Sequence, residues 1–568
     1  MVKKSHTNYK ANTKKSTDKV TIIPIGGLGQ IGKNMMAIEH KNNIVIIDCG
    51  ISLPDTKLLG VDLIIPDFSY IEKNKDKVKA LLITHGHEDH IGGIPYLLQI
   101  LDMPIYGTPL SLGLIQSRLE EHDIPKRPEF ITITPRKVHQ IGPFRIEYIQ
   151  TTHSIADSCG IAIHTDIGTI VHTGDFKIDH TPIDDRKFDF FRFSQLGEEG
   201  VLLLLSDSTN VEKSEQSVSE KELSEKFKST ISDVTGRLYV ATFSSHVHRI
   251  QQILDLAKEH GKKVAFAGKS MLKIVEIASD LGYLHIPSDT IYTIDQINKM
   301  PRNKTVIISS GSQGEPMSTL ALIADDAHKH LDIEKGDTVV LAGGIIPGNE
   351  KSIGKIINRL FSRDAKVLYR GLDEVHVSGH GTKHDLKTMI SLTKPKYFIP
   401  IHGEVRHLIH HSNLAAELGI PRDNIILAQE GDFIELTPNT INKVDNFGPR
   451  LILVDGKGVG DIGNQVLRER AMLADDGIFS VFISMRDEGN RYTTVMESES
   501  KGFVFLKDNE NMLRESKSIV QAILSQVEYN NKQVDIGSIK QKVKGDLRKY
   551  FFELTKRKPV ITVSIVVI

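Results

Sequence analysis

The hydrophobic pattern from residue 20 onward consists of short β-branched and aliphatic runs separated by turn residues. Runs at 20–25, 35–39 and 43–49 predict hairpins and neighbouring strands. Residues 81–84 form another apolar run, and the apolar stretch 91–101 that follows a His-rich loop fits a helix. Further strands are expected at 144–150, 161–165, 169–173 and 201–206. This part of the chain therefore predicts a sheet-rich α/β domain.

The pattern changes near Ser217, where a Lys-, Glu- and Ser-rich helix is expected at 219–230. Strands and helices then alternate, with strands at 238–243 and 264–267 and helices at 250–260 and 271–281. Regular alternation of strand and helix favours a parallel, wound sheet. We therefore expect a second α/β domain with a sheet of its own.

The end of the chain adds a strand at 396–401, a break at 446–450, and helices around 511–528 and 539–555. The final run, 559–568, has the character of a strand and is too short for a membrane span, which needs roughly 18 to 20 apolar residues. The Lys-rich start is not followed by an apolar signal core. We therefore expect neither a membrane span nor a signal peptide.

Composition narrows the class of protein. The chain has 568 residues, 39% of them hydrophobic and 25% charged, which is not the composition of a disordered, collagen-like or disulfide-rich chain. At about 150 residues per domain we expect three or four domains. The two cysteines, Cys49 and Cys159, form no CxxC motif, so neither a disulfide framework nor a thiolate zinc site is supported. A reducing, cytoplasmic compartment is favoured.

The formal net charge of −1 means that a polyanionic partner would be held by local patches. One such patch is the tail 1–18 and Lys19, because the first twenty residues hold six lysines. A disordered, solvated tail is the simpler interpretation, and a contribution to binding such a partner is the alternative.

The strongest candidate chemistry lies directly after the strand expected at 81–84. His85, His87, Glu88, Asp89 and His90 fall within six residues on a loop. Neutral imidazole and carboxylate groups suit zinc or manganese, and a loop can wrap two cations at once. The sequence therefore predicts a metal site here rather than a chance group of surface histidines.

Such a site needs more ligands than one loop offers, so further His and Asp residues are expected where other strands end. His153, Asp175 and His402 each follow a predicted strand. Taken singly, each has an alternative explanation as a capping or core residue. Together with the His-rich loop they form a coherent ligand set.

At this point several motifs resemble a known family. The HGHEDH motif at 85–90, with His153, Asp175 and His402, resembles the metal motifs of the metallo-β-lactamase fold. Asp207, His380 and His402 resemble the additional motifs of its β-CASP nuclease branch. More closely, GGLGQIGKN at 26–34, GSQGEP at 311–316 and GVGDIGN at 458–464 are similar to bacterial ribonuclease J. The resemblance extends from about residue 20 to the end of the chain.

The resemblance implies a metallo-β-lactamase αββα sandwich with an inserted β-CASP α/β domain and a C-terminal α/β domain. The implied divisions are a basic tail at 1–18, the metallo-β-lactamase domain at 19–220 and 378–448, the β-CASP domain at 221–377, a linker at 449–465 and the C-terminal domain at 466–568.

The resemblance also implies a ligand set for two divalent ions, with zinc expected and manganese or magnesium as alternatives. One ion would be held by His85, His87 and His153, the second by Asp89, His90 and His402, with Asp175 between them. Asp48 would orient ligands, as metal-bound histidines usually require. Asp455, with carbonyls near Leu59 and Val61, resembles a position that holds an extra hard cation such as calcium.

Two divalent ions about 4 Å apart can lower the pKa of a shared water to near neutrality. We expect the resulting hydroxide to attack a phosphodiester in line while His380 assists the departing 3′ oxygen. Asp207 would position His380 or a ligand, and Asp175 would be part of the catalytic group.

An RNA strand must reach the metals between the two α/β domains. The candidate holders of its backbone are Ser244, Ser245, His246, His376, Val377, Ser378, Gly379 and His380, where small residues let amide groups approach a phosphate. The resemblance implies a pocket for a 5′ monophosphate, and hence 5′ to 3′ exonuclease action alongside endonuclease action. The Gly-rich segments 311–316 and 343–349 have either a substrate-side role or a role as turns.

Other functions remain open. Residues 27–32 fit GxGxxG, but a strand rather than a helix is expected next, which disfavours a dinucleotide site. A small-molecule metallo-hydrolase would need neither the inserted domain nor Asp207 and His380. A DNA-directed β-CASP nuclease and a non-catalytic RNA-binding subunit are further alternatives, although the latter would be expected to have lost metal ligands.

The resemblance finally implies a cytoplasmic enzyme of mRNA turnover and rRNA maturation whose substrate is single-stranded RNA. It would be a homodimer or homotetramer, or pair with a paralogous subunit, and could join an RNA-degradation complex. Phe551 and Phe552 belong either to such an interface or to the core of the C-terminal domain.

Overall fold

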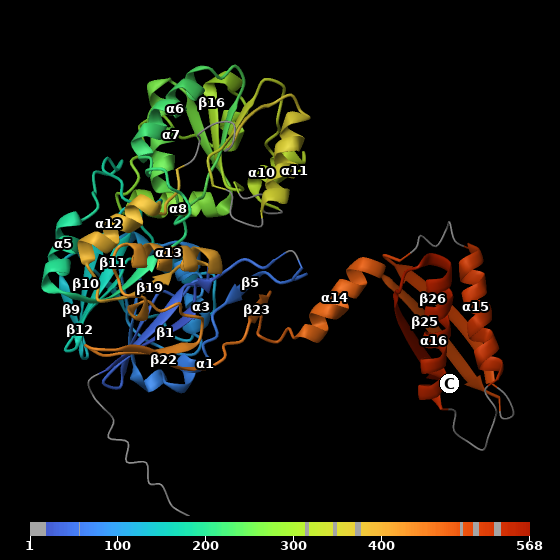
Figure 1. Cartoon of the computed structure of the whole chain (residues 1–568). Helices are drawn as coiled ribbons and strands as arrows, with labels where there is room; N and C mark the ends of the chain where they lie inside the picture. Colours follow the sequence, from blue (N-terminus) through green and yellow to red (C-terminus); the bar gives the residue numbers. More distant parts are fainter. Residues whose placement is uncertain are drawn as a thin grey trace, which may run out of the picture. The chain divides into compact units, whose positions relative to one another are not determined.

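A computed structural model of the chain describes residues 19–55, 57–312, 317–344, 349–369, 377–488, 492–503, 510–526 and 535–568 (Figure 1). The chain divides into two compact units, which are Met1–Leu53 with Ile64–Ile452, and Pro54–Leu63 with Leu453–Ile568. The Lys-rich tail 1–18 lies outside the described residues, as do parts of the Gly-rich segments, 313–316 and 345–348.

The first unit contains an eight-stranded mixed sheet in the order β22-β21-β1-β3-β4-β6-β7-β8. Its strands are β1 Val20–Gly26, β3 Met35–His40, β4 Asn43–Ile47, β6 Val78–Leu82, β7 Ile105–Gly107, β8 Phe130–Thr132, β21 Asp432–Leu436 and β22 Ile441–Asn446. Strands β3 and β4 form a hairpin whose two-residue turn has positive φ at Lys41 (47°) and Asn42 (61°). Such a turn matches the right-handed twist of the strands.

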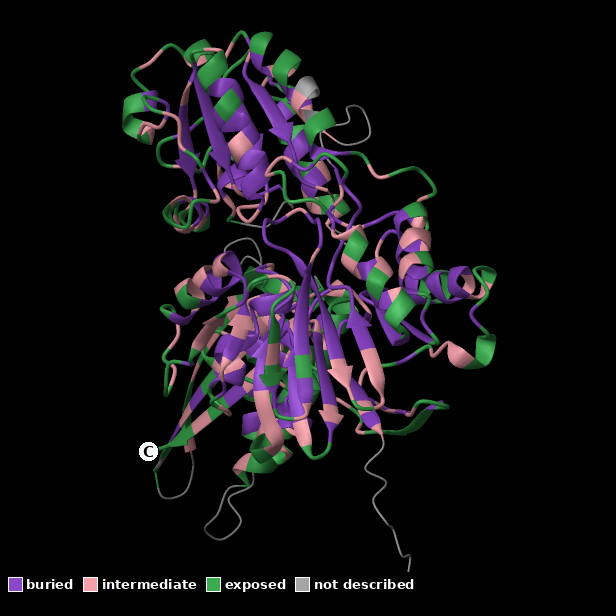
Figure 2. Cartoon of the chain, turned by 90° about the vertical axis from the view of Figure 1, so that its left-hand side faces the viewer, coloured by how far each residue is buried: buried purple, intermediate pink, exposed green. Residues whose placement is uncertain are grey.

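A six-stranded sheet in the order β19-β13-β12-β11-β10-β9 packs against the first. Its strands are β9 Val138–Ile141, β10 Phe144–Gln150, β11 Cys159–Thr165, β12 Gly168–His172, β13 Val201–Asp207 and β19 Tyr397–Ile401. Ile38 and Val45 of the first sheet share one buried core with Ile161 and Leu203 of the second. Apart from β8, β9 and β22, the strands of both sheets are buried over most of their length (Figure 2).

Helices cover the outer faces of these sheets. On the six-stranded sheet, Phe193 of α5 (Phe190–Glu199), Met389 of α12 (Lys383–Thr393) and Leu414 of α13 (Val405–Glu417) share a second core with Phe398 of β19. On the eight-stranded sheet, α4 (Pro109–Leu119) contacts β7 and β8. The two sheets and their helices form the expected αββα sandwich.

A third sheet has five parallel strands in the order β15-β16-β14-β17-β18. The strands are β14 Leu238–Ala241, β15 Lys263–Ala267, β16 Thr305–Ser309, β17 Thr338–Leu341 and β18 Lys366–Leu368. They alternate with the helices α6 Glu220–Ser232, α7 Val247–Glu259, α8 Lys269–Asp280, α10 Thr319–Ala324 and α11 Glu350–Phe361. The parallel sheet expected from the alternating pattern is confirmed.

The second unit contains a three-stranded sheet in the order β26-β25-β27 and three helices. Its elements are α14 Asn464–Asp476, β25 Ile478–Asp487, β26 Tyr492–Lys501, α15 Glu510–Ser525, α16 Ile536–Thr555 and β27 Val560–Val567. Phe551 is fully buried and its ring lies 4.7 Å from that of Phe479, whereas Phe552 is 39% exposed. Phe551 is therefore a core residue.

The structure departs from the sequence pattern at 91–101. Two short helices, α2 (Glu88–Ile91) and α3 (Ile94–Leu97), replace the single helix that the apolar run predicts. The Gly93 N–H donates to the Cys49 carbonyl at 2.8 Å and the Asp89 carbonyl accepts from the Asn34 N–H at 3.0 Å, so contacts with neighbouring segments replace the hydrogen bond from Gly93 to Asp89 that a continuous helix would make. The segment 449–465, expected as a linker, contains the strand pair β23 (Ile452–Asp455) and β24 (Gly458–Val459).

Candidate active site

The chemistry-bearing residues gather where strands of the two packed sheets end. Strands β4 and β6 run parallel, and so do β12, β13 and β19. Because parallel strands end at one edge of a sheet, the residues that follow them are brought together. These residues are Asp48 after β4, His85 to His90 after β6, His153 after β10, Asp175 after β12, Asp207 at the end of β13 and His402 after β19.

Three histidines form a first cluster. The Nε2 atoms of His85 and His153 each lie 3.1 Å from Nδ1 of His87. Two ligands of one tetrahedral zinc ion, each at about 2.1 Å, lie about 3.4 Å apart, so these nitrogens have nearly the spacing of one ligand set. Burial lowers the pKa of His87 to about 4 and holds that of His85 and His153 well below 6.5. The rings are therefore neutral, which is the form that ligates a metal.

A second cluster combines Asp89, His90, Asp175 and His402. His402 Nε2 lies 3.4 Å from Asp89 Oδ2 and 3.5 Å from Asp175 Oδ2, and His90 Nε2 lies 3.2 Å from the same Asp175 oxygen. Burial acts against the charged form of both histidines, but Asp175, Asp89 and the other neighbouring carboxylates together outweigh it and raise the pKa of each well above 6.5. Two carboxylates facing two imidazoles make this cluster attractive to a cation.

Asp175 lies between the two clusters. Its Oδ2 is 3.7 Å from His85 Nε2 and 3.8 Å from His153 Nε2, besides its contacts in the second cluster. One carboxylate oxygen therefore faces both ligand sets. The donor set as a whole, imidazole nitrogens and carboxylate oxygens at this spacing, fits a pair of divalent ions.

The rings of the ligands are held in place from behind. Asp48 Oδ2 lies 2.8 Å from His90 Nδ1, and the same carboxylate accepts hydrogen bonds from the backbone N–H and the hydroxyl of Thr84. The Thr84 hydroxyl is in turn 3.0 Å from His85 Nδ1. Asp48 thus fixes the His90 ring directly and the His85 ring through Thr84, an arrangement that metal-binding histidines generally need.

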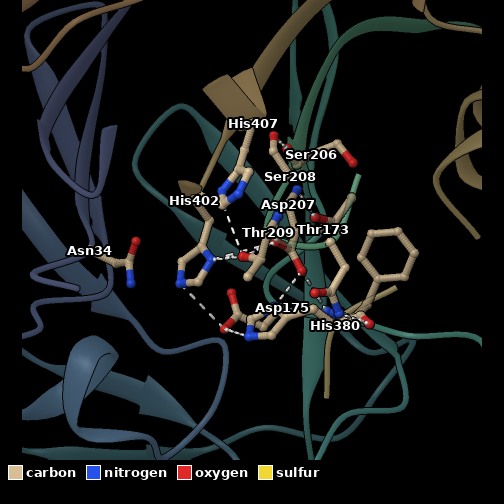
Figure 3. Close-up of polar contacts among 12 residues, drawn as sticks. Asn34, Thr173, Asp175, Ser206, Asp207, Ser208, Thr209, His380, His402 and His407 are labelled. Atoms are coloured by element: carbon tan, nitrogen blue, oxygen red, sulfur yellow. Dashed lines mark hydrogen bonds and ion pairs between the residues drawn. The ribbon is translucent and has the colours of Figure 1, made fainter. Parts of the chain in front are cut away.

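His380 stands at the edge of the second cluster, paired with Asp207 (Figure 3). His380 Nδ1 lies 2.8 Å from Asp207 Oδ2, and its Nε2 lies 3.9 Å from Asp175 Oδ2. Burial would raise the pKa of Asp207, but the neighbouring His380 and His402 together outweigh it and hold that pKa well below its usual range. The carboxylate therefore stays ionised and directs Nε2 of His380 toward the ligand clusters.

Three residues that had no role assigned from the sequence form hydrogen bonds with residues of the candidate site. The Thr209 hydroxyl lies 2.7 Å from His402 Nδ1, and the Asn34 amide donates to the Asp89 carbonyl at 3.0 Å. Asn210 donates to Ser378 Oγ at 2.7 Å and to the His380 carbonyl at 2.8 Å. Asn34 lies inside the GGLGQIGKN motif, and Thr209 and Asn210 follow Asp207, so the signal was adjacency to residues already chosen.

The described part of the candidate substrate segment 376–380 lies close to the two clusters. His376 lies outside the described residues, and Val377 is buried. Ser378 and Gly379 lie beside the ligands, because the Gly379 carbonyl is 2.6 Å from His153 Nδ1.

The segment 244–246 has a mixed character. Ser244 and Ser245 are half-buried. His246 is 1% exposed, its N–H donates to the Phe243 carbonyl and its ring faces Glu220. In this structure neither the amide nor the ring of His246 is free for a phosphate.

The carbonyl and carboxylate expected to hold an extra cation already face a positive charge. Arg470 donates to the Leu59 carbonyl at 3.0 Å and to Asp455 Oδ2. The guanidinium passes close over Gly60, where a Cβ would lie 2.7 Å from Arg470 Nη1. The Val61 N–H donates to the Leu58 carbonyl. A metal ion would have to displace Arg470 from Asp455.

Comparisons with known proteins bear on the whole chain. Four family models match it: the metallo-beta-lactamase superfamily at 28–222, the ribonuclease J beta-CASP domain at 235–360, the Zn-dependent metallo-hydrolase RNA specificity domain at 364–426 and the ribonuclease J C-terminal domain at 465–568.

Relatives agree over nearly the full length. The chain is 39% identical to ribonuclease J of Helicobacter pylori strain J99, over 98% of this chain and 80% of that protein. It is 40% identical to ribonuclease J 1 of Streptococcus pyogenes, over 96% of this chain and 97% of that protein. The chain belongs to the ribonuclease J family. Ribonuclease J2 of Bacillus subtilis is 38% identical, over 96% of this chain and 98% of its own length.

A solved structure supports the fold. A protein of unknown function from Enterococcus faecalis V583 matches this ribonuclease J family member with a TM-score of 0.51 and 15% identity, covering 74% of this chain and 100% of that one. The expected metallo-β-lactamase fold with β-CASP and C-terminal domains is confirmed by the family models. Strand β3 stands where a dinucleotide motif would need a helix, so the GxGxxG interpretation of 27–32 fails.

Proposed function

We propose that this protein cleaves single-stranded RNA in the 5′ to 3′ direction from a 5′ monophosphate, and also internally. As a member of the ribonuclease J family with a metallo-β-lactamase domain it is a metal-dependent ribonuclease. The direction, the 5′ preference and the endonuclease action are the finer part of the proposal. The observation that carries it is the pair of ligand clusters joined by Asp175 with His380 beside them.

The residues that would hold the two ions are those of the two clusters. His85, His87 and His153 would hold one, Asp89, His90 and His402 the other, and Asp175 would contact both. Two divalent ions bound there, which we propose to be zinc with manganese or magnesium as alternatives, would lower the pKa of a water and neutralise charge on the phosphoryl oxygens. Asp48 and Thr209 keep the ligand rings in position.

His380 handles the proton on the leaving side. Asp207 accepts the hydrogen on Nδ1, so Nε2, which points toward the clusters, can donate a proton only from the doubly protonated ring, a cation that the ionised Asp207 carboxylate stabilises. The side chain is 20% exposed, so a substrate atom can reach it. Nε2 would donate to the departing 3′ oxygen as it gains negative charge. Asp207 is thus a positioning residue for His380.

The substrate side is proposed to use the backbone of 377–380 together with Ser244 and Ser245. Asn210 fixes the first of these segments through Ser378 and the His380 carbonyl, so its amide groups are held in one arrangement. Preorganised N–H groups of this kind suit a phosphate. His376 would extend the same segment.

We further propose the domain limits 19–220 with 378–448, 221–377 and 466–568, a cytoplasmic location, and a dimer or tetramer formed with itself or a paralogue. The role is proposed to lie in mRNA turnover and rRNA maturation, within an RNA-degradation complex. Support for the location is that Cys49 and Cys159 are both free and buried. Among the described residues, no helix is both long and apolar enough to span a bilayer.

The test is a time course on one RNA bearing a 5′ monophosphate or a 5′ triphosphate, with Mn²⁺ or Mg²⁺ and a chelated control. We expect mononucleotides to appear only with metal and faster from the monophosphate. A matched DNA oligonucleotide and a thioester substrate are run in parallel. Preferred cleavage of the DNA, or turnover of the thioester without any RNA cleavage, would overturn the proposal in favour of the corresponding alternative.

A further inference from the structure

A buried group of charged residues joins the β-CASP helices to the loop that carries Asp175. We call Lys177, Asp179, Glu220, His246 and Arg249 the Glu220 cluster. All five side chains are at most 3% exposed. They come from three separate parts of the chain: the loop after β12, the first residue of α6, and the start of α7.

Glu220 is the centre of this cluster because each of its carboxylate oxygens faces a different part of the molecule. Oε2 accepts a hydrogen bond of 2.8 Å from Arg249 Nη2 on α7. Oε1 lies 3.5 Å from Lys177 Nζ and 3.4 Å from His246 Nε2. Its carbonyl accepts from Gln252 at 2.6 Å, and its N–H donates to Asp179 at 3.2 Å.

The contacts of His246 define which of its ring nitrogens carries the hydrogen. Nδ1 of this ring accepts the N–H of Arg249 at 3.3 Å and so caps helix α7. Burial lowers the pKa of His246 to about 4 despite the nearby Glu220, so the ring is neutral. Its single ring hydrogen is therefore on Nε2, which lies 3.4 Å from Glu220 Oε1 but has no hydrogen-bond partner among the described residues. The residue that follows Ser244 and Ser245 is thus packed against the Glu220 carboxylate.

The Lys177 side leads back to the metal ligands. Lys177 is two residues after Asp175. It forms an isolated β-bridge with Thr152, the residue before His153, in which the Lys177 N–H donates to the Thr152 carbonyl. The Lys177 side chain is 1% exposed, and its Nζ has no hydrogen-bond partner in the described part of the chain. It forms ion pairs with Glu220 at 3.5 Å and with Asp179 at 3.6 Å. These two carboxylates therefore compensate the charge of the buried ammonium group.

Charge balance makes the cluster sensitive to one substitution. Lys177 and Arg249 provide two buried positive charges, and Asp179 and Glu220 provide two negative ones. An unpaired buried charge costs far more than a paired one. Neutralising Glu220 would leave two cations facing one carboxylate at the junction between the two domains.

We propose that Glu220 is a positioning residue. It fixes the start of α7 and the preceding segment with Ser244 and Ser245, which we call the β-CASP wall, relative to the loop carrying Asp175. The inference rests on the proposed function, since it assigns Ser244 and Ser245 to the RNA side and Asp175 to the metal side. RNA binding then depends on Glu220, whereas chemistry on a substrate that touches only the metal clusters does not.

The test is Glu220→Gln, which keeps the volume and removes the charge. We expect KM for 5′-monophosphorylated RNA to rise by about ten-fold or more, with metal content unchanged. The rate on bis(p-nitrophenyl) phosphate, which is too small to reach the β-CASP wall, should change by less than about two-fold. Amide hydrogen exchange around 243–252 should become faster. Glu259→Gln, the same change at an exposed ion pair with Lys228 at the end of α7, should behave as wild type.

Adding Lys177→Met to Glu220→Gln restores the balance of buried charge and should return KM toward the wild-type value. If Glu220→Gln alone does not fold, the double variant decides by the same readouts. An unchanged KM for RNA in a folded Glu220→Gln protein overturns the inference, as does an equal loss on both substrates. If wild-type protein cleaves no RNA, the proposed function fails, and the exchange rates of 243–252 still decide whether Glu220 holds this segment.

Discussion

The carbonyl oxygen of Gly379 lies 2.6 Å from Nδ1 of His153, so a residue of the proposed substrate segment fixes the ring of a proposed metal ligand. The contact joins positions 226 residues apart. It sets the tautomer of His153, because a hydrogen on Nδ1 leaves the lone pair of Nε2 free to face His87.

This relationship predicts the effect of Gly379→Ala. The added Cβ would lie 2.6 Å from His153 Cε1 and 2.6 Å from Ser154 Oγ, closer than atoms can approach. The ring of His153 must move, so we expect metal affinity to fall by about 10-fold to 100-fold and cleavage to fall with it. Metal content after dialysis, measured by mass spectrometry, checks this.

The control for that variant is Gly354→Ala in α11, where nothing lies within 4 Å of the added Cβ. It should keep its metal and its activity. A Gly379→Ala protein that retains full metal content would show that the carbonyl contact does not govern the ligand.

Replacing His380 by Ala should leave the metals in place and slow RNA cleavage by about 10² to 10⁴. The physical reason is that Nε2, held by Asp207 toward the clusters, is no longer there to protonate the departing oxygen. Single-turnover rates and metal content are measured together. His384→Ala, an exposed histidine at the start of α12, is the matched control. Loss of metal along with activity would instead make His380 a ligand, since it also lies within the group formed by Asp175, Asp207 and His402.

The sequence could group the candidate ligands because each one follows an apolar strand. Such strands are buried, and the residues after parallel strands meet at one edge. His153 and His402 could be chosen in this way although they are far apart in the chain. The same rule could not show Gly379 behind His153 or Asn210 behind Ser378, since these contacts depend on how the two domains pack.

Local patterns failed where close packing outweighed them. The apolar run 91–101 has the length of a helix, but the Gly93 N–H donates to the Cys49 carbonyl of a neighbouring segment, and the helix is divided there. Glu220 could not be singled out from the sequence either. It is one of several acidic residues in a Lys-, Glu- and Ser-rich helix, and only the fold reveals that it is buried against Lys177 and Arg249.

His411 should make stability depend on pH. It is fully buried, its Nδ1 bonds the Ser208 hydroxyl at 3.0 Å, and burial lowers its pKa to about 3 from 6.5. Between these values the unfolded chain binds a proton that the folded protein does not, so stability falls as pH decreases from about 6.5 toward 3. A Gln side chain does not titrate in this range, so His411→Gln lacks this contribution to the pH dependence of stability.

The measurement is the free energy of unfolding of wild type and of His411→Gln between pH 7 and pH 5. The difference between them should shift in favour of the variant by up to about 1.4 kcal/mol for each pH unit below 6.5. His410→Gln, at the exposed neighbouring position, should show no such trend. A pH-independent difference for His411→Gln would mean that the folded protein binds the proton as readily as the unfolded chain.

From the contacts of Arg470 we predict how the thermal stability of the C-terminal unit responds to calcium. Its guanidinium bonds the Leu59 carbonyl and Asp455, so wild-type protein should gain no thermal stability from millimolar calcium. Arg470→Ala exposes both oxygens, which are hard ligands of the kind calcium prefers. We expect this variant to unfold at a lower temperature in EGTA and to recover part of the loss when calcium is added. Arg468→Ala, an exposed arginine on the same helix, should respond like wild type in calorimetry. Calcium stabilising the wild-type protein would mean that the ion displaces Arg470 from Asp455, and that the cation expected from the sequence binds there after all.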